Sequence, residues 1–535
     1  RGHKGRSPKR RYARLGNSGE PAGSAGLPGS MDGGNDDMTK ALENGSVRRL
    51  VVVSNRLPVV LSSSDGKWRS EPGSGGLVTA LAPVLRNRGG LWIGWPGTSA
   101  ETGIQEVLLR ATGDAGYSLI AVPLNRDDIS RYYRGFSNEV IWPLFHDLQT
   151  RCNFDPEYWD AYGDVNRKFA DVTAAHTDDG DFIWVHDYHL MLMAQNLREL
   201  GSGARLGFFL HIPFPPLDIF VKLPWRHQLL RALLAYDLVG FQTMRDRRNF
   251  VQCLRTLVNG TETRGRGQVC EISADDMHVR AGVFPIGIDY RQFERDAGSH
   301  EVAESAWHIH ENLPDRQIVL GVDRMDYTKG IPERLKAFGH LLERHPEHRR
   351  RVTLVQVVVP SRRGIPEYEM LKTEIEQLVG QINGRFTESS AWVPIHYIYG
   401  SLGRLDLLGY YRASEIALLT PYKDGMNLVA KEYCACSLEE NSVLILSEFA
   451  GAVAEMQRGA ILVNPYDIDG VAEALHEAIV MPPAERHRRM HLLRLVVKKH
   501  DVFWWVDSFL RASIEKDLGN FPIIADYVPN APRHR

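Results

Sequence analysis

Short runs of β-branched and apolar residues recur along the chain from Arg48 onward, and each run ends in Gly, Asn, Asp or Pro before an amphipathic stretch begins. Such runs are typical of parallel strands that are buried on both faces and joined through helices in βαβ units. The first series of predicted strands comprises residues 50–54, 91–94, 119–123, 182–185, 206–210, 238–241 and 279–284.

A second series of strands begins near Gln317, after Pro and Gly interrupt the pattern at residues 285–289. It comprises residues 318–322, 352–359, 395–398, 416–419, 443–447 and 461–463. The two series predict an α/β protein with two Rossmann-like, doubly wound domains. Ligands of such sheets bind beyond the carboxyl ends of the strands, so the residues that follow each strand are the candidates for function.

These patterns divide the chain into five predicted segments. They are a disordered basic N-terminal tail (1–46), an N-terminal Rossmann-like domain (47–288), a C-terminal Rossmann-like domain (289–495), C-terminal helices that return to the N-terminal domain (496–518) and a polar tail (519–535).

Composition excludes several classes of function. The 64 Lys and Arg nearly cancel the 66 Asp and Glu, so no overall charge favours nucleic acid or an anionic membrane as a partner. No apolar run approaches the roughly 20 residues of a spanning helix, which predicts a soluble protein. The 5 cysteines are few and odd in number, which predicts reduced thiols and a cytoplasmic location. We expect Cys434 and Cys436 to be buried helix residues rather than a metal pair.

Polar residues follow the first predicted strand and then open a helix. Arg56 ends the sequence Ser54-Asn55-Arg56, and a glycine-rich stretch at residues 73–77 includes Gly76. Glycines at the start of a helix let backbone N–H groups approach an anion closely. A glycine-rich turn without a phosphate fits equally well, because the G-x-G-x-x-G spacing is not met.

Histidines and an aspartate follow two later strands of the first series. His186, Asp187 and His189 follow one strand, and His211 follows the next. A metal site would need further carboxylate ligands, and no second cluster supplies them. We expect Asp187 and His211 to bind sugar hydroxyls, and His186 and His189 to form hydrogen bonds with loops.

Two cations lie five residues apart in the loop that follows the first strand of the second series. They are Arg324 and Lys329, and a predicted helix begins directly after them. Charge-assisted donors next to a helix N-terminus suit a diphosphate, and surface salt bridges are the alternative explanation. Arg362 and Arg363 follow the next strand and add further positive charge.

The sequence from Asp424 to Glu432 combines two carboxylates with a glycine-containing turn into a helix. Backbone N–H groups of the turn can bind a sugar or phosphate oxygen. We expect Glu432, two turns along the same helical face, to bind a ribose diol.

These residues belong to motifs that follow one another in a fixed order. The motifs are SNRLP, GGL, YYRGFSN, IWPLFH, WVHDYHL, GFFLHIPFP, DRMDYTKG, DGMNLVAKEY and VNPYD. From about Val51 to Phe509 the chain resembles the trehalose-6-phosphate synthases, which are retaining glycosyltransferases of family 20 with the GT-B fold. The resemblance implies that the N-terminal domain binds the acceptor and that the C-terminal domain binds a nucleotide sugar across a cleft.

The resemblance also implies a role for each candidate residue. The residues implied to bind glucose 6-phosphate are Arg56, Tyr133, Trp142, Asp187 and Arg362, with Arg363 as an alternative to Arg362. The residues implied to bind the nucleoside-diphosphate glucose are Gly76, His211, Arg324, Lys329, Asp424, Gly425, Met426, Asn427, Leu428, Val429 and Glu432. The implied catalytic residues are Asp187, His211, Arg324, Lys329 and Asp424.

The implied reaction transfers glucose from UDP-, ADP- or GDP-glucose to glucose 6-phosphate, with retention of configuration, and gives trehalose 6-phosphate. No carboxylate nucleophile of the glycosidase type is identifiable, so the implied mechanism is front-face, with the leaving diphosphate accepting the proton. No metal or other cofactor is expected, because Arg324 and Lys329 neutralise the diphosphate. The sequence leaves the donor base open, and the resemblance implies a homo-oligomer, either a dimer or a tetramer.

Two alternatives to an active synthase also fit parts of this sequence. Another GT-B transferase, such as a sucrose-phosphate-synthase-like or glycogen-synthase-like protein, would share the cation pair but would not need Arg56 together with Arg362. A catalytically inactive sugar-phosphate sensor would keep the fold but is expected to have lost part of the donor site. All the charged donor-site residues are present, which favours the active enzyme.

Overall fold

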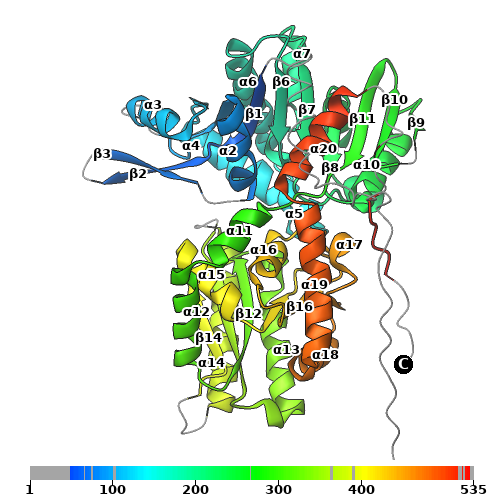
Figure 1. Cartoon of the computed structure of the whole chain (residues 1–535). Coiled ribbons are helices and arrows are strands. Elements are labelled where there is room, and N and C mark those ends of the chain that lie inside the picture. The colour runs from blue at the N-terminus through cyan, green and yellow to red at the C-terminus, as the bar shows by residue number, and fades with distance from the viewer. Residues whose placement is uncertain are drawn as a thin grey trace, which may run out of the picture.

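The computed structural model describes residues 49–64, 67–73, 76–99, 104–265, 267–361, 365–387, 392–515, 521 and 524–529. The predicted N-terminal tail and Arg362 lie outside the described residues. Figure 1 shows two lobes, one above the other, each built around a twisted sheet with helices packed against it. No helix in the described part of the chain is long and apolar enough to cross a membrane.

The first lobe contains a nine-stranded sheet with the order β5-β4-β1-β6-β7-β8-β11-β10-β9. From β5 to β11 neighbouring strands are parallel, whereas β10 and β9 are antiparallel at one edge. Its strands are β1 (Leu50–Arg56), β4 (Leu91–Trp95), β5 (Ser118–Ala121), β6 (Phe182–His186), β7 (Arg205–Phe209), β8 (Leu238–Phe241), β9 (Glu262–Arg264), β10 (Val269–Ala274) and β11 (Met277–Val283). A separate hairpin is formed by β2 (Val59–Ser64) and β3 (Lys67–Pro72).

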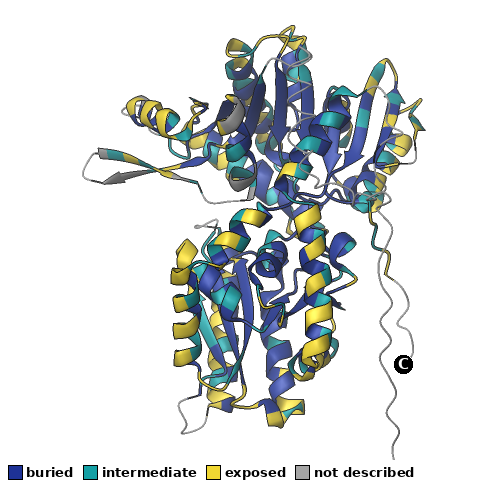
Figure 2. Cartoon of the chain, in the orientation of Figure 1, coloured by how far each residue is buried: buried dark blue, intermediate teal, exposed yellow. Residues whose placement is uncertain are grey.

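The second lobe contains a six-stranded parallel sheet with the order β14-β13-β12-β15-β16-β17. Its strands are β12 (Gln317–Arg324), β13 (Val352–Val359), β14 (Ile395–Tyr399), β15 (Ile416–Leu419), β16 (Val443–Ser447) and β17 (Ile461–Val463). Figure 2 shows that the strands of both sheets are mostly buried, while the outer faces of the helices are exposed.

Helices cover both sheets and provide the connections between their strands. Those between β3 and β11 are α2 (Gly76–Arg88), α3 (Ile104–Ala115), α4 (Arg126–Asp128), η2 (Ile129–Ile141), α5 (Trp142–Phe145), η3 (Gln149–Arg151), α6 (Pro156–Ala175), η4 (Tyr188–Leu190), α7 (Met193–Glu199), α8 (Leu217–Phe220), α9 (Arg226–Leu234) and α10 (Met244–Leu257). Those after β11 are α11 (Tyr290–Ala297), α12 (His300–Asn312), η5 (Tyr327–Lys329), α13 (Ile331–Arg344), η6 (Pro346–His348), α14 (Pro366–Phe386), α15 (Arg404–Ala413), α16 (Leu428–Cys436), α17 (Val453–Met456), α18 (Ile468–Val480), α19 (Pro483–Lys499) and α20 (Val502–Ile514).

The strands predicted from β-branched runs are confirmed, each to within two residues at either end. Four strands were not predicted, namely β2, β3, β9 and β10. The sequence of β9 is ETR and that of β3 is KWRSEP, so neither carries the apolar run that marks a buried strand. Edge strands and hairpins of this kind form through pairing with a neighbour rather than through burial on both faces.

The chain crosses between the lobes twice, and the last helix packs on the first sheet. Phe509 of α20 stacks on Trp184 of β6, with ring centroids 4.3 Å apart. Gly207 and Gly240, in the neighbouring strands β7 and β8, leave room for this ring, because an added Cβ at either position would lie within 2.9 Å of it. Arg280 of β11 also donates a hydrogen bond to the Ala512 carbonyl at 3.0 Å.

A buried ionic network joins the two crossings. The Nζ of Lys431 in α16 lies 2.7 Å from Glu455 and donates a hydrogen bond to the carbonyl of Ile286 in the first crossing at 2.8 Å. Glu455 also contacts Nδ1 of His500, in the second crossing, at 2.6 Å. The second crossing then bonds the first directly, since the backbone N–H of Val502 reaches the Ile288 carbonyl at 3.0 Å.

Candidate active site between the two sheets

Contacts between the lobes bring the carboxyl ends of their strands together. The guanidinium of Arg324, at the end of β12, lies over the ring of Trp142 in the first lobe, 5.8 Å from its centroid. Gly425 lies so close to the first lobe that an added Cβ would overlap the carbonyl oxygen of His211. These contacts bring Arg324 and Gly425 of the second lobe against Trp142 and His211 of the first, as expected for ligand sites of doubly wound sheets.

Arg56 is the last residue of β1, and it is exposed. Its guanidinium lies over the ring of Trp95, 4.6 Å from the centroid, in a cation–π contact that restrains a long side chain. Gly97 packs against the same guanidinium, and its φ of 91° lies in the left-handed region. Any side chain at Gly97 would be strained and would overlap Arg56, so this glycine is needed to keep the arginine in place.

Tyr133 and Trp142 come from a segment with an unusual helical form. Tyr133 lies in the π-helix η2, a form often found at functional sites, and Trp142 follows directly at the start of α5. Tyr133 lies 5.7 Å from Trp95 and stacks on His189 at 5.9 Å between ring centroids. The ring of Trp142 lies 4.2 Å from that of His146. The segment thus adds aromatic faces beside Arg56.

A cavity of about 490 Å³ opens beside these aromatic side chains. Its lining includes Trp95, Gly97 and Tyr133, together with the exposed cations Arg126 and Arg134. Aromatic faces next to guanidinium groups suit a sugar phosphate, because rings pack on apolar C–H surfaces and guanidinium groups bind phosphate oxygens. This arrangement can bind a small anionic sugar.

Asp187 and His211 follow the adjacent strands β6 and β7. Asp187 adopts a φ of 74°, a conformation that is uncommon for a residue with a Cβ and that recurs at functional sites. Its Oδ1 accepts a hydrogen bond from the backbone N–H of His211 at 3.3 Å. The Nε2 of His211 lies 3.1 Å from Nδ1 of His186. Burial lowers the pKa of His211 to about 3, so near pH 7 its ring is neutral and can bind a hydroxyl without contributing charge.

On the second lobe, Lys329 and Asp424 form an ion pair. Their Nζ and Oδ2 atoms are 2.6 Å apart, and the side chains are only 11% and 17% exposed. Burial favours the neutral form of Asp424, but attraction to Lys329 outweighs it, so the pKa of the Asp424 carboxyl is lowered. Surface salt bridges were the alternative explanation for the cations of this loop. Lys329 does form a salt bridge, but its partner is the candidate residue Asp424 rather than a surface carboxylate.

The loop that carries Lys329 is fixed by its own sequence. Asp326 precedes η5, and its Oδ1 accepts a hydrogen bond from the backbone N–H of Thr328 at 3.0 Å. Gly330 has a φ of 61°, and an added Cβ there would overlap the carbonyl oxygen of Thr420. Glycine is therefore the residue that allows α13 to begin directly after Lys329.

The turn before α16 corrects one prediction. Asn427 has a φ of 87°, and its side chain accepts a hydrogen bond from the N–H of Ala430, so the helix begins only at Leu428. Asp424 therefore lies outside the helix. The expectation that Glu432 lies two turns along the helical face that follows this turn is wrong, because α16 begins at Leu428, about one turn before Glu432.

The first turn of α16 and Glu432 complete the described donor-side candidates. The N–H groups of Leu428 and Val429 lie at the helix N-terminus, which carries partial positive charge. Glu432 accepts a hydrogen bond from the hydroxyl of Tyr411 at 2.8 Å, and burial raises the pKa of its carboxyl. Met426 is buried in the core.

The remaining candidate glycine, cysteines and arginines can be described briefly. Gly76 begins α2, as expected for the glycine-rich stretch. Cys434 and Cys436 are buried within α16, so the expectation that they are helix residues is confirmed. Arg362 and Arg363 lie outside the described residues.

Three residues without a predicted role contact the candidate set. Trp95, which holds Arg56, ends β4 and could have been found by inspecting every strand end. His146 has its Nδ1 2.7 Å from the Trp142 carbonyl, and burial lowers its pKa to about 3. Lys423 joins the lobes through Asp147, with Nζ and Oδ2 2.6 Å apart. No sequence signal pairs Lys423 with Asp147, because the two residues lie far apart along the chain.

Comparisons with known proteins agree with this geometry. The sequence matches the profile of Glycosyltransferase family 20 over residues 48–515. A trehalose-6-phosphate synthase from Mycolicibacterium vanbaalenii is 42% identical over 473 residues, which cover 87% of this chain and 96% of that protein. An alpha,alpha-trehalose-phosphate synthase [UDP-forming] A from Dictyostelium discoideum is 40% identical over 474 residues, which cover 88% of this chain and 63% of that protein.

Solved structures with the same fold include two with substrates or analogues. The alpha,alpha-trehalose-phosphate synthase (UDP-forming) from Burkholderia xenovorans, in complex with glucose-6-phosphate, aligns with a TM-score of 0.79 and 36% identity over 87% of this chain and 100% of that chain. A protein from E. coli, described as trehalose-6-phosphate bound with UDP-2-fluoro glucose, aligns with a TM-score of 0.77 and 36% identity over 87% of this chain and 98% of that chain.

The fold, the facing strand ends and these alignments define the class of protein. It is a glycosyltransferase enzyme with two Rossmann-like α/β lobes, and the predicted fold class is confirmed. The chain belongs to glycosyltransferase family 20.

Proposed function

We propose that this enzyme transfers glucose from a nucleoside-diphosphate glucose to glucose 6-phosphate, with retention of configuration, and releases trehalose 6-phosphate and the nucleoside diphosphate. The contact of Arg324 with Trp142 carries the proposal, because it joins the cations of the second lobe to the aromatic residues of the first. The relatives from Mycolicibacterium vanbaalenii and Dictyostelium discoideum are named as trehalose-phosphate synthases, which supports the same reaction.

The acceptor binds mainly to the first lobe. Arg56 binds the phosphate, and Tyr133 and Trp142 pack on the sugar ring. A second phosphate ligand is Arg362 or Arg363, which come after β13 in the second domain. The cavity beside Tyr133 supports this assignment, since its lining already combines aromatic faces with cations. The contact with Trp95 already restrains Arg56, so little conformational entropy is lost when phosphate binds.

The donor binds to the second lobe. Lys329 uses one of its three donors for Asp424, so it retains donors for a diphosphate oxygen. The Asp424 carboxylate accepts hydrogen bonds from hydroxyls of the donor glucose, and the neutral ring of His211 donates or accepts one. The diphosphate also meets Gly76 and the first N–H groups of α16, and Glu432 binds the ribose. The base is uracil, adenine or guanine.

The transfer follows a front-face path. The bond between the anomeric carbon and the diphosphate oxygen breaks, and its electron pair stays on that oxygen. The anomeric hydroxyl of glucose 6-phosphate attacks from the same face and gives its proton to the departing phosphate. Arg324 and Lys329 stabilise the growing negative charge, and Asp187 lies between the two sugars. We predict that these two cations suffice and that no metal cofactor is required.

Turnover assays test the proposed function. The purified protein is incubated with glucose 6-phosphate and, separately, with UDP-, ADP- and GDP-glucose, with and without EDTA. We expect release of the nucleoside diphosphate together with an α,α-linked, non-reducing disaccharide phosphate, detected by NMR, and no loss of rate with EDTA. Failure of all three donors, with glucose 6-phosphate binding intact by calorimetry, would instead support a sugar-phosphate sensor. A cytoplasmic location and a homo-oligomeric state stay predictions, and the latter is checked by light scattering.

A further inference from the structure

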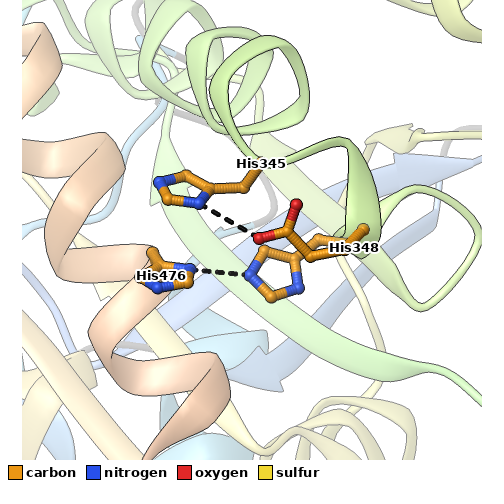
Figure 3. Close-up of side chains that lie close together, drawn as sticks. His345, His348 and His476 are labelled. Carbon is orange, nitrogen blue, oxygen red and sulfur yellow. Dashed lines mark hydrogen bonds and ion pairs between the residues drawn. The ribbon is translucent and has the colours of Figure 1, made fainter.

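A cluster of three histidines and one glutamate lies in the second lobe, far from the candidate active site. His345 follows α13, Glu347 and His348 belong to η6, and His476 comes from α18. Each residue offers one ligand atom, and these atoms all lie within 4.8 Å of one another. Figure 3 shows the three imidazole rings gathered between the turn after α13 and the facing helix. We call these four residues the histidine cluster.

The histidine cluster lies at the amino ends of the strands, opposite the edge that carries Lys329. His348 precedes β13, and the side chain of Gln317, at the start of β12, donates a hydrogen bond to the Ile479 carbonyl in α18. Helix α13 spans the lobe between the two edges, from the loop of Lys329 to His345. The proposed transfer reaction uses none of the four residues.

The three rings are already close enough for their nitrogen atoms to bind one metal ion. His348 Nε2 and His476 Nδ1 are 2.8 Å apart, so one proton lies between two nitrogen lone-pair positions. The rings of His345 and His476 stack with centroids 3.8 Å apart and an angle of 13°. Bonds of about 2.0 Å in a tetrahedral site separate ligand atoms by roughly 3.3 Å, so a metal would need only a small opening of the His348–His476 pair.

A second carboxylate orients His345. Its Nδ1 lies 3.3 Å from Oε1 of Glu347 within the histidine cluster, and its Nε2 lies 3.4 Å from Oε1 of Glu473 on the other side. Metal-binding histidines characteristically give their other ring N–H to such a carboxylate, which fixes the tautomer and the ring orientation. Glu473 also pairs with Arg344 at 3.2 Å, which fixes the carboxylate in turn.

Charge around the histidine cluster permits a cation. The neighbouring Arg344 is neutralised by two carboxylates, since its terminal nitrogen atoms lie 3.4 Å from Asp469 and 3.2 Å from Glu473. His348 is buried, whereas Glu347 is exposed and leaves access from solvent. Arg351 also acts on His348 and opposes a cation, but the carboxylate of Glu347 lies in the cluster itself and offsets it.

We propose that His345, Glu347, His348 and His476 form a zinc site that fastens the end of α13 to α18. Three imidazole nitrogens and one carboxylate suit Zn²⁺ and related borderline cations, whereas Mg²⁺ and Ca²⁺ prefer oxygen ligands. The metal takes the position of the proton between His348 and His476. Because the site joins segments 128 residues apart in sequence, its occupation stabilises the lobe and leaves the chemistry of the other edge unchanged.

Zinc titration of the full chain without a polyhistidine tag tests this site. The protein is first treated with a chelator, and Zn²⁺ binding is followed by calorimetry, with Co²⁺ as a spectroscopic probe. We expect one tight site per chain, intense visible bands of tetrahedral Co²⁺, and a higher Tm with zinc. Glu473→Gln should weaken zinc binding roughly 10- to 100-fold, and His476→Gln or the exposed Glu347→Gln should weaken it further.

A matched control uses another histidine pair. His487 and His491 lie on α19 with ring centroids 6.1 Å apart and share Glu440 as a neighbour. The double variant His487→Gln/His491→Gln should retain the tight site. Unchanged zinc affinity in both His476→Gln and Glu347→Gln would overturn the proposal, as would loss of the tight site in the α19 variant. Circular dichroism of each variant establishes that it is folded before titration.

Discussion

The two sheets present charge at their facing edges in different ways. At the edge of the first sheet, Arg56 is exposed and rests on Trp95, and it has no ion-pair partner within the described ranges. At the edge of the second sheet, Lys329 is nearly buried and is neutralised by Asp424. Deeper in the same lobe, Lys431 is neutralised by Glu455 with both side chains at most 2% exposed.

A positively charged side chain therefore has a different role at each of the two edges. Arg56 has no carboxylate partner within the described ranges, so an incoming phosphate has no counter-ion to displace. A buried lysine must have a counter-charge, since an uncompensated buried ion costs several kcal/mol. In the second lobe the ion pairs hold Lys329 and Lys431 in place, so removal of one partner should have larger consequences there.

The largest expected effect concerns the deepest pair. Lys431→Met leaves Glu455 buried beside His500 without its main counter-charge, which should reduce the free energy of unfolding by about 3–5 kcal/mol. Urea denaturation followed by circular dichroism measures the change. The double variant Lys431→Met/Glu455→Gln should recover most of the loss, and a loss below about 1 kcal/mol in the single variant would contradict the proposed cost of the unpaired charge.

The next effect concerns the pair in the candidate site. Lys329→Ala removes a cation that stabilises charge growing on the leaving diphosphate, so kcat should fall by about 10²- to 10³-fold. Steady-state kinetics with saturating glucose 6-phosphate measure it. Lys329→Arg keeps the charge and is the matched control. A rise in donor KM with unchanged kcat would show uniform binding and would contradict a role in the transition state.

Arg56 provides the contrasting test on the first sheet. Arg56→Ala removes charge-assisted hydrogen bonds to the acceptor phosphate, worth about 1.5–3 kcal/mol, so the acceptor KM should rise about 10- to 150-fold. The donor KM should stay the same. Arg56→Lys keeps the charge but loses the planar fork and should give an intermediate value. If the donor KM rises as much as the acceptor KM, the division between the lobes is wrong.

The smallest expected effect is the loss of folding stability per pH unit in acid. Burial lowers the folded-state pKa of both His146 and His211 to about 3. Below the unfolded-state pKa the unfolded chain binds more protons, so each histidine should reduce stability by about 1.4 kcal/mol per pH unit as the pH falls from roughly 6.5 toward 3. Urea midpoints at several pH values measure the slope. His146→Gln should make the slope shallower, and an unchanged slope would contradict a buried neutral His146.

Most of the fold could be predicted because strands that are buried on both faces have continuous runs of apolar residues in the sequence. Runs such as residues 352–359 lie in the middle of a parallel sheet, so every position is apolar or tightly packed and the strand ends are sharp. The polar strand β9 could not be predicted, because it forms through pairing with β10 at an edge. The π-helix η2 leaves no comparable periodic signal.

The candidate site shows where sequence reasoning ends. Inspecting residues after strands finds Arg56, Asp187 and Arg324, because topology alone brings strand ends to one edge. The pairing of Lys329 with Asp424 could not be predicted from the sequence. It depends on the loops that follow β12 and β15, which are neighbours only in the folded sheet. The left-handed backbone of Asn427 was equally hidden, and it accounts for the error about Glu432.

In the proposed complex the acceptor phosphate binds at the edge of the first sheet and the diphosphate at the edge of the second. Calorimetric titration of glucose 6-phosphate and of UDP, each into Arg56→Ala and into Lys329→Ala, tests it most directly. Arg56→Ala should lose glucose 6-phosphate binding and keep UDP binding, and Lys329→Ala should show the reverse. Loss of both ligands in either folded variant, or loss of neither, would contradict the account.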